Sequence, residues 1–203
     1  AAEFRIGPAR RTHFKMGSSS RLFLDFGGGL TWLEAVTDRQ RTENPPIIMH
    51  KTKIGLFGIG LDTYWPQFKG LKTRLEGYLR EVHRKLKRPG VDVVNLGLID
   101  SPPKAFEAGH AFRQADVDLI FLHVTTYALS STVLPVVQRA KVPVIILNLS
   151  PVPAIDYAAF NQMNDRTAMT GEWLAHCAAC PVSEIANVFN RARINFHQIT
   201  GQL

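Results

Sequence analysis

The feature that most constrains the fold is a regular alternation of short apolar runs and amphipathic segments, which begins near residue 53. The apolar runs have the length of β-strands and occupy residues 53–59, 91–99, 117–124, 142–149 and 195–200. The segments between them have helical spacing or proline and glycine at their ends, and occupy residues 68–88, 102–115, 130–140, 165–177 and 181–191. Strands that alternate with helices predict a parallel sheet with helices on both faces. The predicted fold class is α/β, flavodoxin-like (Rossmann-like).

Residues 1–50 do not share this pattern. They contain scattered arginines, a serine cluster at residues 18–20 and three consecutive glycines at residues 27–29. Their apolar residues keep no sustained period of either 2 or 3.6. We therefore expect an irregular N-terminal extension over residues 1–50 and one α/β domain over residues 51–203. A native segment and a fused segment are both open interpretations of the extension.

The net charge of +7 is not by itself evidence for a nucleic-acid partner. Many of the basic residues fall within residues 69–88, where they share a helix with an apolar stripe made of Phe68, Leu71, Leu75, Tyr78, Val82 and Leu86. Basic residues opposite such a stripe form a solvated face, and basic charge alone gives only weak, sequence-independent binding to nucleic acid. We expect no nucleic-acid partner.

The longest apolar stretch, residues 142–149, is too short to span a bilayer and is interrupted by Pro143 and Asn148. The first residues show no apolar core followed by a cleavage site. These observations predict a cytoplasmic protein with no membrane association.

Five segments together resemble a known family. They are residues 53–65 (KIGLFGIGLDTYW), 115–123 (ADVDLIFLH), 142–148 (VPVIILN), 167–173 (TAMTGEW) and 196–202 (FHQITGQ). In this order they are similar to the N-terminal domain of the L-arabinose and L-fucose isomerases. The resemblance covers residues 52–203 and none of the first fifty.

The resemblance implies a homo-oligomer in which different domains carry the metal ligands and the wall of the sugar pocket. Enzymes of that family interconvert aldoses and ketoses with a divalent metal, commonly manganese, whose glutamate and histidine ligands lie in later domains. This sequence stops before those domains, so the resemblance implies a truncated domain without isomerase activity. It also places the loop after the first strand near a neighbour's sugar pocket, which here is residues 58–65 with Asp62 and Tyr64.

Polar residues follow the strands at the edge where ligands bind in open parallel sheets. We predict His123 and Asp62 as catalytic residues, and Tyr64, Tyr127 and Asn148 as residues that bind a small-molecule ligand. An alternative is open, because polar residues line this edge in any such fold and His123 has an equally ordinary role as a buried, hydrogen-bonded histidine.

His176, Cys177 and Cys180 have the spacing of metal ligands, since a C-x-x-C pair binds one ion with two thiolates. They predict half a site for zinc or another divalent metal, at the end of the sheet opposite His123. Ordinary packing of the two cysteines is the alternative.

Two functions remain open at this point. One is a non-catalytic, isomerase-like domain that forms homo-oligomers and has a candidate cleft for a small ligand. The other is a zinc-dependent hydrolase of activated esters or phosphoesters, in which the metal activates water.

Overall fold

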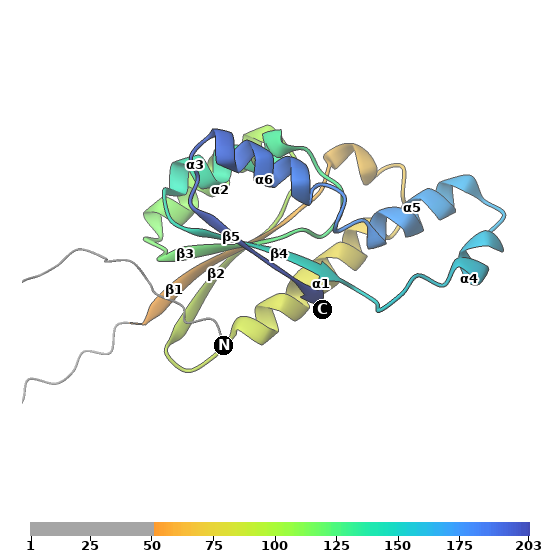
Figure 1. Ribbon diagram of the computed structural model, residues 1–203, viewed down its shortest axis with the longest axis horizontal. Helices are drawn as coiled ribbons and strands as arrows, with labels where there is room; N and C mark the ends of the chain where they lie inside the picture. The colour runs from red at the N-terminus through yellow and green to blue at the C-terminus, as the bar shows by residue number, and fades with distance from the viewer. Residues whose placement is uncertain (1–50) are drawn as a thin grey trace, which may run out of the picture. The chain divides into compact units, whose positions relative to one another are not determined.

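The computed structural model describes residues 51–203, which form a five-stranded parallel sheet with helices on both faces (Figure 1). The strands are β1 (Thr52–Ile59), β2 (Val91–Ile99), β3 (Leu119–His123), β4 (Val144–Ser150) and β5 (Phe196–Gln202). Their order across the sheet is β2-β1-β3-β4-β5, and every neighbouring pair is parallel. This is the flavodoxin-like order, so the predicted fold class is confirmed. The predicted extension, residues 1–50, lies outside the described residues.

Helices connect the strands. They are α1 (Leu71–Leu86), α2 (Pro102–Gln114), α3 (Leu134–Ala140), α4 (Tyr157–Asn161), α5 (Arg166–His176) and α6 (Val182–Arg191), with short 3-10 helices η1 (Asp62–Tyr64) and η2 (Ser130–Thr132). None of the helices in residues 51–203 is long and apolar enough to cross a membrane.

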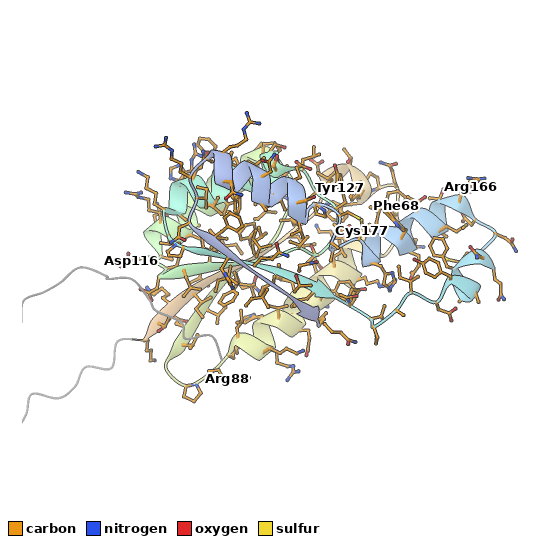
Figure 2. The ribbon with its side chains drawn as sticks, viewed as in Figure 1. Phe68, Arg88, Asp116, Tyr127, Arg166 and Cys177 are labelled. Carbon is orange, nitrogen blue, oxygen red and sulfur yellow. The ribbon has the colours of Figure 1, made fainter. Side chains whose placement is uncertain are left out.

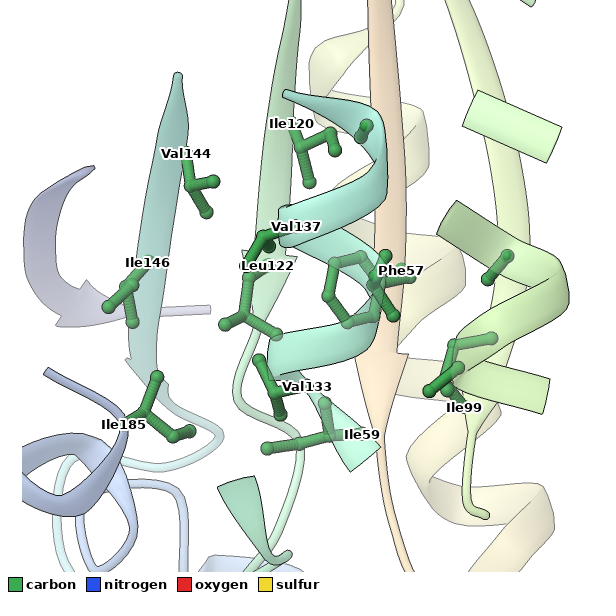
Figure 3. Packing of buried hydrophobic residues seen from close by; sticks show 14 of the residues in the cluster. Phe57, Ile59, Ile99, Ile120, Leu122, Val133, Val137, Val144, Ile146 and Ile185 are labelled. Atoms are coloured by element: carbon green, nitrogen blue, oxygen red, sulfur yellow. The ribbon is translucent and has the colours of Figure 1, made fainter. Parts of the chain in front are cut away.

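Helices α2, α3 and α6 cover one face of the sheet with the larger apolar core. Figure 3 shows Ile120 and Leu122 of β3 near Phe57 of β1, with Val137 of α3 close by. Ile185 of α6 extends this core over β4, and all five side chains are buried. Full burial of such a side chain stabilises the fold by about 1.5–3 kcal/mol relative to exposure. This core holds the strands in place, and so fixes the positions of the loops that follow them.

Helix α1 covers the opposite face together with α5. The predicted stripe is confirmed at Leu71, Leu75 and Val82, which are buried against the sheet, and Leu79 is buried with them. Phe68 packs against the same cluster but precedes the helix, which begins at Leu71. Exposed basic residues occupy the outer side of α1, as a solvated face predicts: they are Lys72, Arg80, Arg84 and Lys85.

Two helix predictions were wrong. Residues 130–140 were expected to form one helix, but they form η2 and then α3. Pro135 has no backbone N–H, and its ring clashes with the preceding turn of a helix, so one uninterrupted helix cannot continue through it. Helix α3 therefore begins separately, with this proline in its first turn. Helix α4 was missed within a proline-rich bend. The Asp156 carboxylate begins it by accepting a hydrogen bond from the Ala159 N–H at 3.0 Å.

The predicted position of Cys177 was also wrong. We expected the helix at residues 165–177 to run back along the sheet and carry Cys177 to the end opposite His123. Instead, α4 and the start of α5 reach beyond the end of β4, and α5 returns to the carboxyl edge (Figure 1). There the Thr126 hydroxyl, just after β3, donates a hydrogen bond to the Leu174 carbonyl of α5 at 2.7 Å. The crossover to β5 is made by α6, because Phe196 of β5 pairs with Val144, the first residue of β4.

Candidate functional site

The chain reverses direction across the sheet between β1 and β3, because β2 lies on one side of β1 and β3 on the other. In parallel sheets the crevice at such a reversal, beyond the carboxyl ends of the strands, is the usual ligand site. Here the buried Thr125 hydroxyl bridges the two strand ends. It accepts a hydrogen bond from the Ile59 N–H at 3.1 Å and donates one to the Ile59 carbonyl. Thr125 therefore closes the base of the crevice, and the polar groups that can meet a ligand lie outside it.

Two tyrosines and a cysteine gather beside this closed crevice. Tyr64 follows β1 and Tyr127 follows β3, and Figure 2 shows Tyr127 and Cys177 in the same region of the molecule. Burial raises the pKa of Tyr64 above its ordinary value, and the nearby Tyr127 and Cys177 raise it further. Tyr64 also packs edge-on against Phe68, with 5.8 Å between ring centroids. Two of the predicted ligand-binding residues are thus brought together as half-buried phenols.

Asn148, the third predicted ligand-binding residue, has a different neighbour. Its side-chain amide lies 3.4 Å from the Thr200 hydroxyl on β5, so it bridges two strands at the other side of the sheet. Asp62, predicted to be catalytic, lies in η1 with its side chain exposed. Its catalytic role stays a prediction.

His123, the other residue predicted to be catalytic, is only 1% exposed, at the last position of β3. Among the described residues, its Nδ1 atom has no hydrogen-bond partner. Burial lowers the pKa of His123 to about 4, so the imidazole is neutral near pH 7. A histidine enclosed in this way meets no substrate in this conformation. The role of His123 as a base also stays a prediction. Its lowered pKa has a measurable consequence for the stability of the fold at acidic pH.

Asp100 holds the loop after β1 against the end of β2, with a carboxylate that is 2% exposed. It accepts hydrogen bonds from the Trp65 indole at 2.8 Å and from the Lys104 ammonium at 2.7 Å. Burial alone would raise the pKa of Asp100, but these two bonds outweigh it and the pKa lies below its ordinary value. Asp100 is one of the polar residues that follow the predicted strands, but neither of its two partners was predicted. The spacing of four residues between Asp100 and Lys104, which suits one helical turn, was the available signal.

The predicted metal site is not assembled. The His176 Nδ1–H donates to the Glu172 carbonyl at 2.9 Å, and its Nε2 lies 3.5 Å from an Arg74 nitrogen, so the imidazole points back along α5. Cys177 is instead buried, and burial and then the nearby Cys180 raise its pKa. Within residues 51–203, no group of three or more His, Cys, Asp or Glu side chains is placed to hold a metal ion. The zinc-hydrolase hypothesis needs about three protein ligands at one point, and no observation on the described residues favours it.

An ion pair joins α1 to α5 beside a hollow of about 450 Å³. The Arg74 guanidinium lies 2.5 Å from the Glu172 carboxylate and donates to the Tyr78 hydroxyl at 2.7 Å. The hydrogen bond from Arg74 lowers the pKa of Glu172, although partial burial of the Glu172 carboxyl acts to raise it. These contacts fix the end of α5 that carries His176 and Cys177.

Replacing Glu172 with glutamine is expected to lower the free energy of unfolding by only about 0.5 kcal/mol, because the pair is partly exposed to water. The exposed side-chain fractions are 37% for Arg74 and 33% for Glu172. The difference should fade as the pH falls through the Glu172 pKa, where the carboxyl loses its charge. Urea unfolding measures this, with E81Q as a control for the exposed pair of Glu81 and Arg84, where no change is expected. A loss above about 2 kcal/mol would show that the pair behaves as a buried one.

A larger hollow, of about 640 Å³, lies between α4 and α5. Apolar and polar side chains both line it: Phe160, Met169 and Trp173, with Asn161, Asn164, Arg166 and Thr170. The Trp173 side chain is 46% exposed, and Tyr157 of α4 is 66% exposed. We call α4 and α5 together the α4–α5 arm. Sequence reasoning missed this surface because it missed α4.

Comparison with known proteins adds no family to this description. No protein-family model matches the chain, and no curated protein matches it. The resemblance to sugar isomerases therefore rests on the five sequence segments alone.

Proposed function

We propose that residues 51–203 are a sugar-isomerase-like domain whose role is assembly: it joins copies of the chain through the α4–α5 arm and presents Tyr64 and Tyr127 to a small hydroxylated ligand. The observation that carries the proposal is the arm itself. It reaches beyond the sheet, and Trp173 is exposed at the lining of the open hollow, with Tyr157 exposed elsewhere on the arm. Exposed large aromatic side chains beside a hollow are typical of protein interaction sites.

The proposed partner of the arm is a second copy of this chain. A two-fold contact brings the same surface together twice, so that surface must complement itself in charge. The arm meets this condition because it carries an acidic residue, Asp156, at the start of α4 and a basic one, Arg166, at the start of α5. Both side chains are exposed, and each is available to meet the opposite charge on a partner.

The proposal assigns no isomerase chemistry to these residues. In the enzymes that the chain resembles, the metal-binding glutamates and histidines lie in later domains. The N-terminal domain of those enzymes forms part of the wall of a neighbouring subunit's sugar pocket. Tyr64 and Tyr127 suit that part, since a phenol hydroxyl both donates to and accepts from a sugar hydroxyl. Assembly then matters to the site, because the edge is completed by another chain.

Sedimentation velocity of the full chain over a range of concentrations tests the proposal. We expect a reversible dimer or larger species, and we expect W173D to raise its Kd by about tenfold or more, because a charge replaces an aromatic anchor. The matched control is F106S. Phe106 is 49% exposed, much like Trp173, but it lies on α2 beneath the Arg139 guanidinium.

The proposal fails if the unmodified chain sediments as a monomer at every concentration. It also fails if F106S weakens association as much as W173D does, because the contact would then lie elsewhere.

A further inference from the structure

The two cysteines of the chain flank the bend between α5 and α6. Cys177 ends α5 and is buried, while Cys180 is exposed just before α6. Cys180 lies near enough to Cys177 to add to the effect of burial on the Cys177 pKa. With two residues between them, at the bend between two helices, the two cysteines have the C-x-x-C spacing of pairs that form an internal disulfide. No other cysteine in the sequence competes for either thiol.

The two thiols differ in exposure to solvent, so each would have a different role in an exchange reaction. Burial, and then the nearby Cys180, raises the pKa of Cys177 to about 12, so this sulfur keeps its proton at neutral pH. Cys180 is the sulfur that an external molecule can reach. An exposed thiol near a buried second thiol is the arrangement used in thiol–disulfide exchange.

We propose that Cys177 and Cys180 form a thiol–disulfide exchange site, which takes up an internal disulfide from low-molecular-weight disulfides such as glutathione disulfide. In the first step the Cys180 thiolate attacks one sulfur of the external disulfide and releases one thiolate, leaving a mixed disulfide on Cys180. In the second step Cys177 gives up its proton and attacks the Cys180 sulfur. This forms the Cys177–Cys180 bond and releases the second external thiol. The two protein thiols are oxidised and the external disulfide is reduced to two thiols.

The site lies beside the candidate ligand edge. Cys177 is close enough to Tyr64 to influence the pKa of its phenol, as is Tyr127. Forming the disulfide removes the ionisable Cys177 thiol, one of the groups that raise the pKa of Tyr64, so the proposal links the oxidation state of the pair to that edge.

Intact-mass measurement of the full chain tests the proposal, with the reduced protein exposed to glutathione disulfide. We expect a single chain that is lighter by two hydrogen atoms and has lost both alkylatable thiols. C177A should stop at a glutathione adduct on Cys180. C180S should react at least about tenfold more slowly than the unmodified chain, because its remaining thiol is buried.

Two results would overturn the proposal. In one, the unmodified chain stops at a stable glutathione adduct. In the other, Cys180 joins two chains through an intermolecular disulfide, which appears as a doubled mass that a reductant removes. Both readouts use the unmodified chain, so they hold whether or not the variants fold.

Discussion

Replacing His123 with leucine is expected to abolish most of the loss of stability that the protein undergoes between pH 6.5 and pH 4. In the unfolded chain a histidine binds its proton near its ordinary pKa of 6.5, whereas burial lowers the pKa of folded His123 to about 4. Below pH 6.5 the unfolded state therefore binds a proton that the folded state does not, and stability falls as the pH falls. Over the whole window the loss approaches about 3 kcal/mol. Above pH 6.5 neither state is protonated, and the full stability is present.

The measurement is chemical unfolding of the unmodified chain and of H123L at neutral pH and near pH 4. At neutral pH, H123L should be at least as stable as the unmodified chain, because leucine fills the site without burying a nitrogen that lacks a partner. H197Q is the matched control, since His197 is exposed on β5, and it should keep the full sensitivity to acid. Equal losses for H123L and the unmodified chain on acidification would contradict the account of His123.

Replacing Gly109 with alanine is expected to lower the free energy of unfolding by about 2–3 kcal/mol, although alanine is the better helix former. A β-carbon at Gly109 of α2 would lie 2.9 Å from the carbonyl oxygens of Pro135 and Val136, and 2.8 Å from the Arg139 β-carbon. Two of these atoms belong to the backbone of α3, which cannot move aside without separating the helices. The variant must therefore strain the contact between α2 and α3.

G77A is the matched control, because it makes the same change in a helix with open space. The nearest atom to a β-carbon at Gly77 of α1 is a guanidinium nitrogen of Arg80, at 3.6 Å. G77A should raise stability by about 0.5–1 kcal/mol through helix propensity alone. Urea unfolding of both variants gives the signs directly. If G109A also gained stability, the close approach of α2 and α3 would be wrong.

Much of the fold was predictable because the buried strands are marked by their own composition. The predicted and observed bounds of β2 coincide at residues 91–99, since Pro89-Gly90 and Asp100 punctuate an apolar run. The helix across residues 130–140 failed at Pro135, a break that a stricter reading of the proline would have found. Helix α4 was missed because five residues hold too few apolar positions to show a period.

The candidate site was predictable only in part, because it depends on which helix makes a crossover. Tyr64 and Tyr127 were placed at the same edge because each follows a predicted strand of a parallel sheet, and the structure brings them together. The position of Cys177 was wrong because α6, rather than α5, crosses to β5. Two helices in succession both satisfy helical periodicity, and periodicity does not say which one crosses the sheet. The hydroxyl bridge from Thr125 to Ile59 was missed for a similar reason, since it joins residues far apart in the sequence.

Hydrogen exchange of the full chain at protein concentrations below and above the association midpoint tests the assembly role most directly. If copies join through the α4–α5 arm, amides within residues 157–176 should exchange more slowly at the higher concentration. Amides of α2, on the far side of the sheet, should exchange at the same rate in both samples. Protection that rises over α2 while the arm stays unchanged, or exchange that is the same everywhere at both concentrations, would contradict the proposed role of the arm.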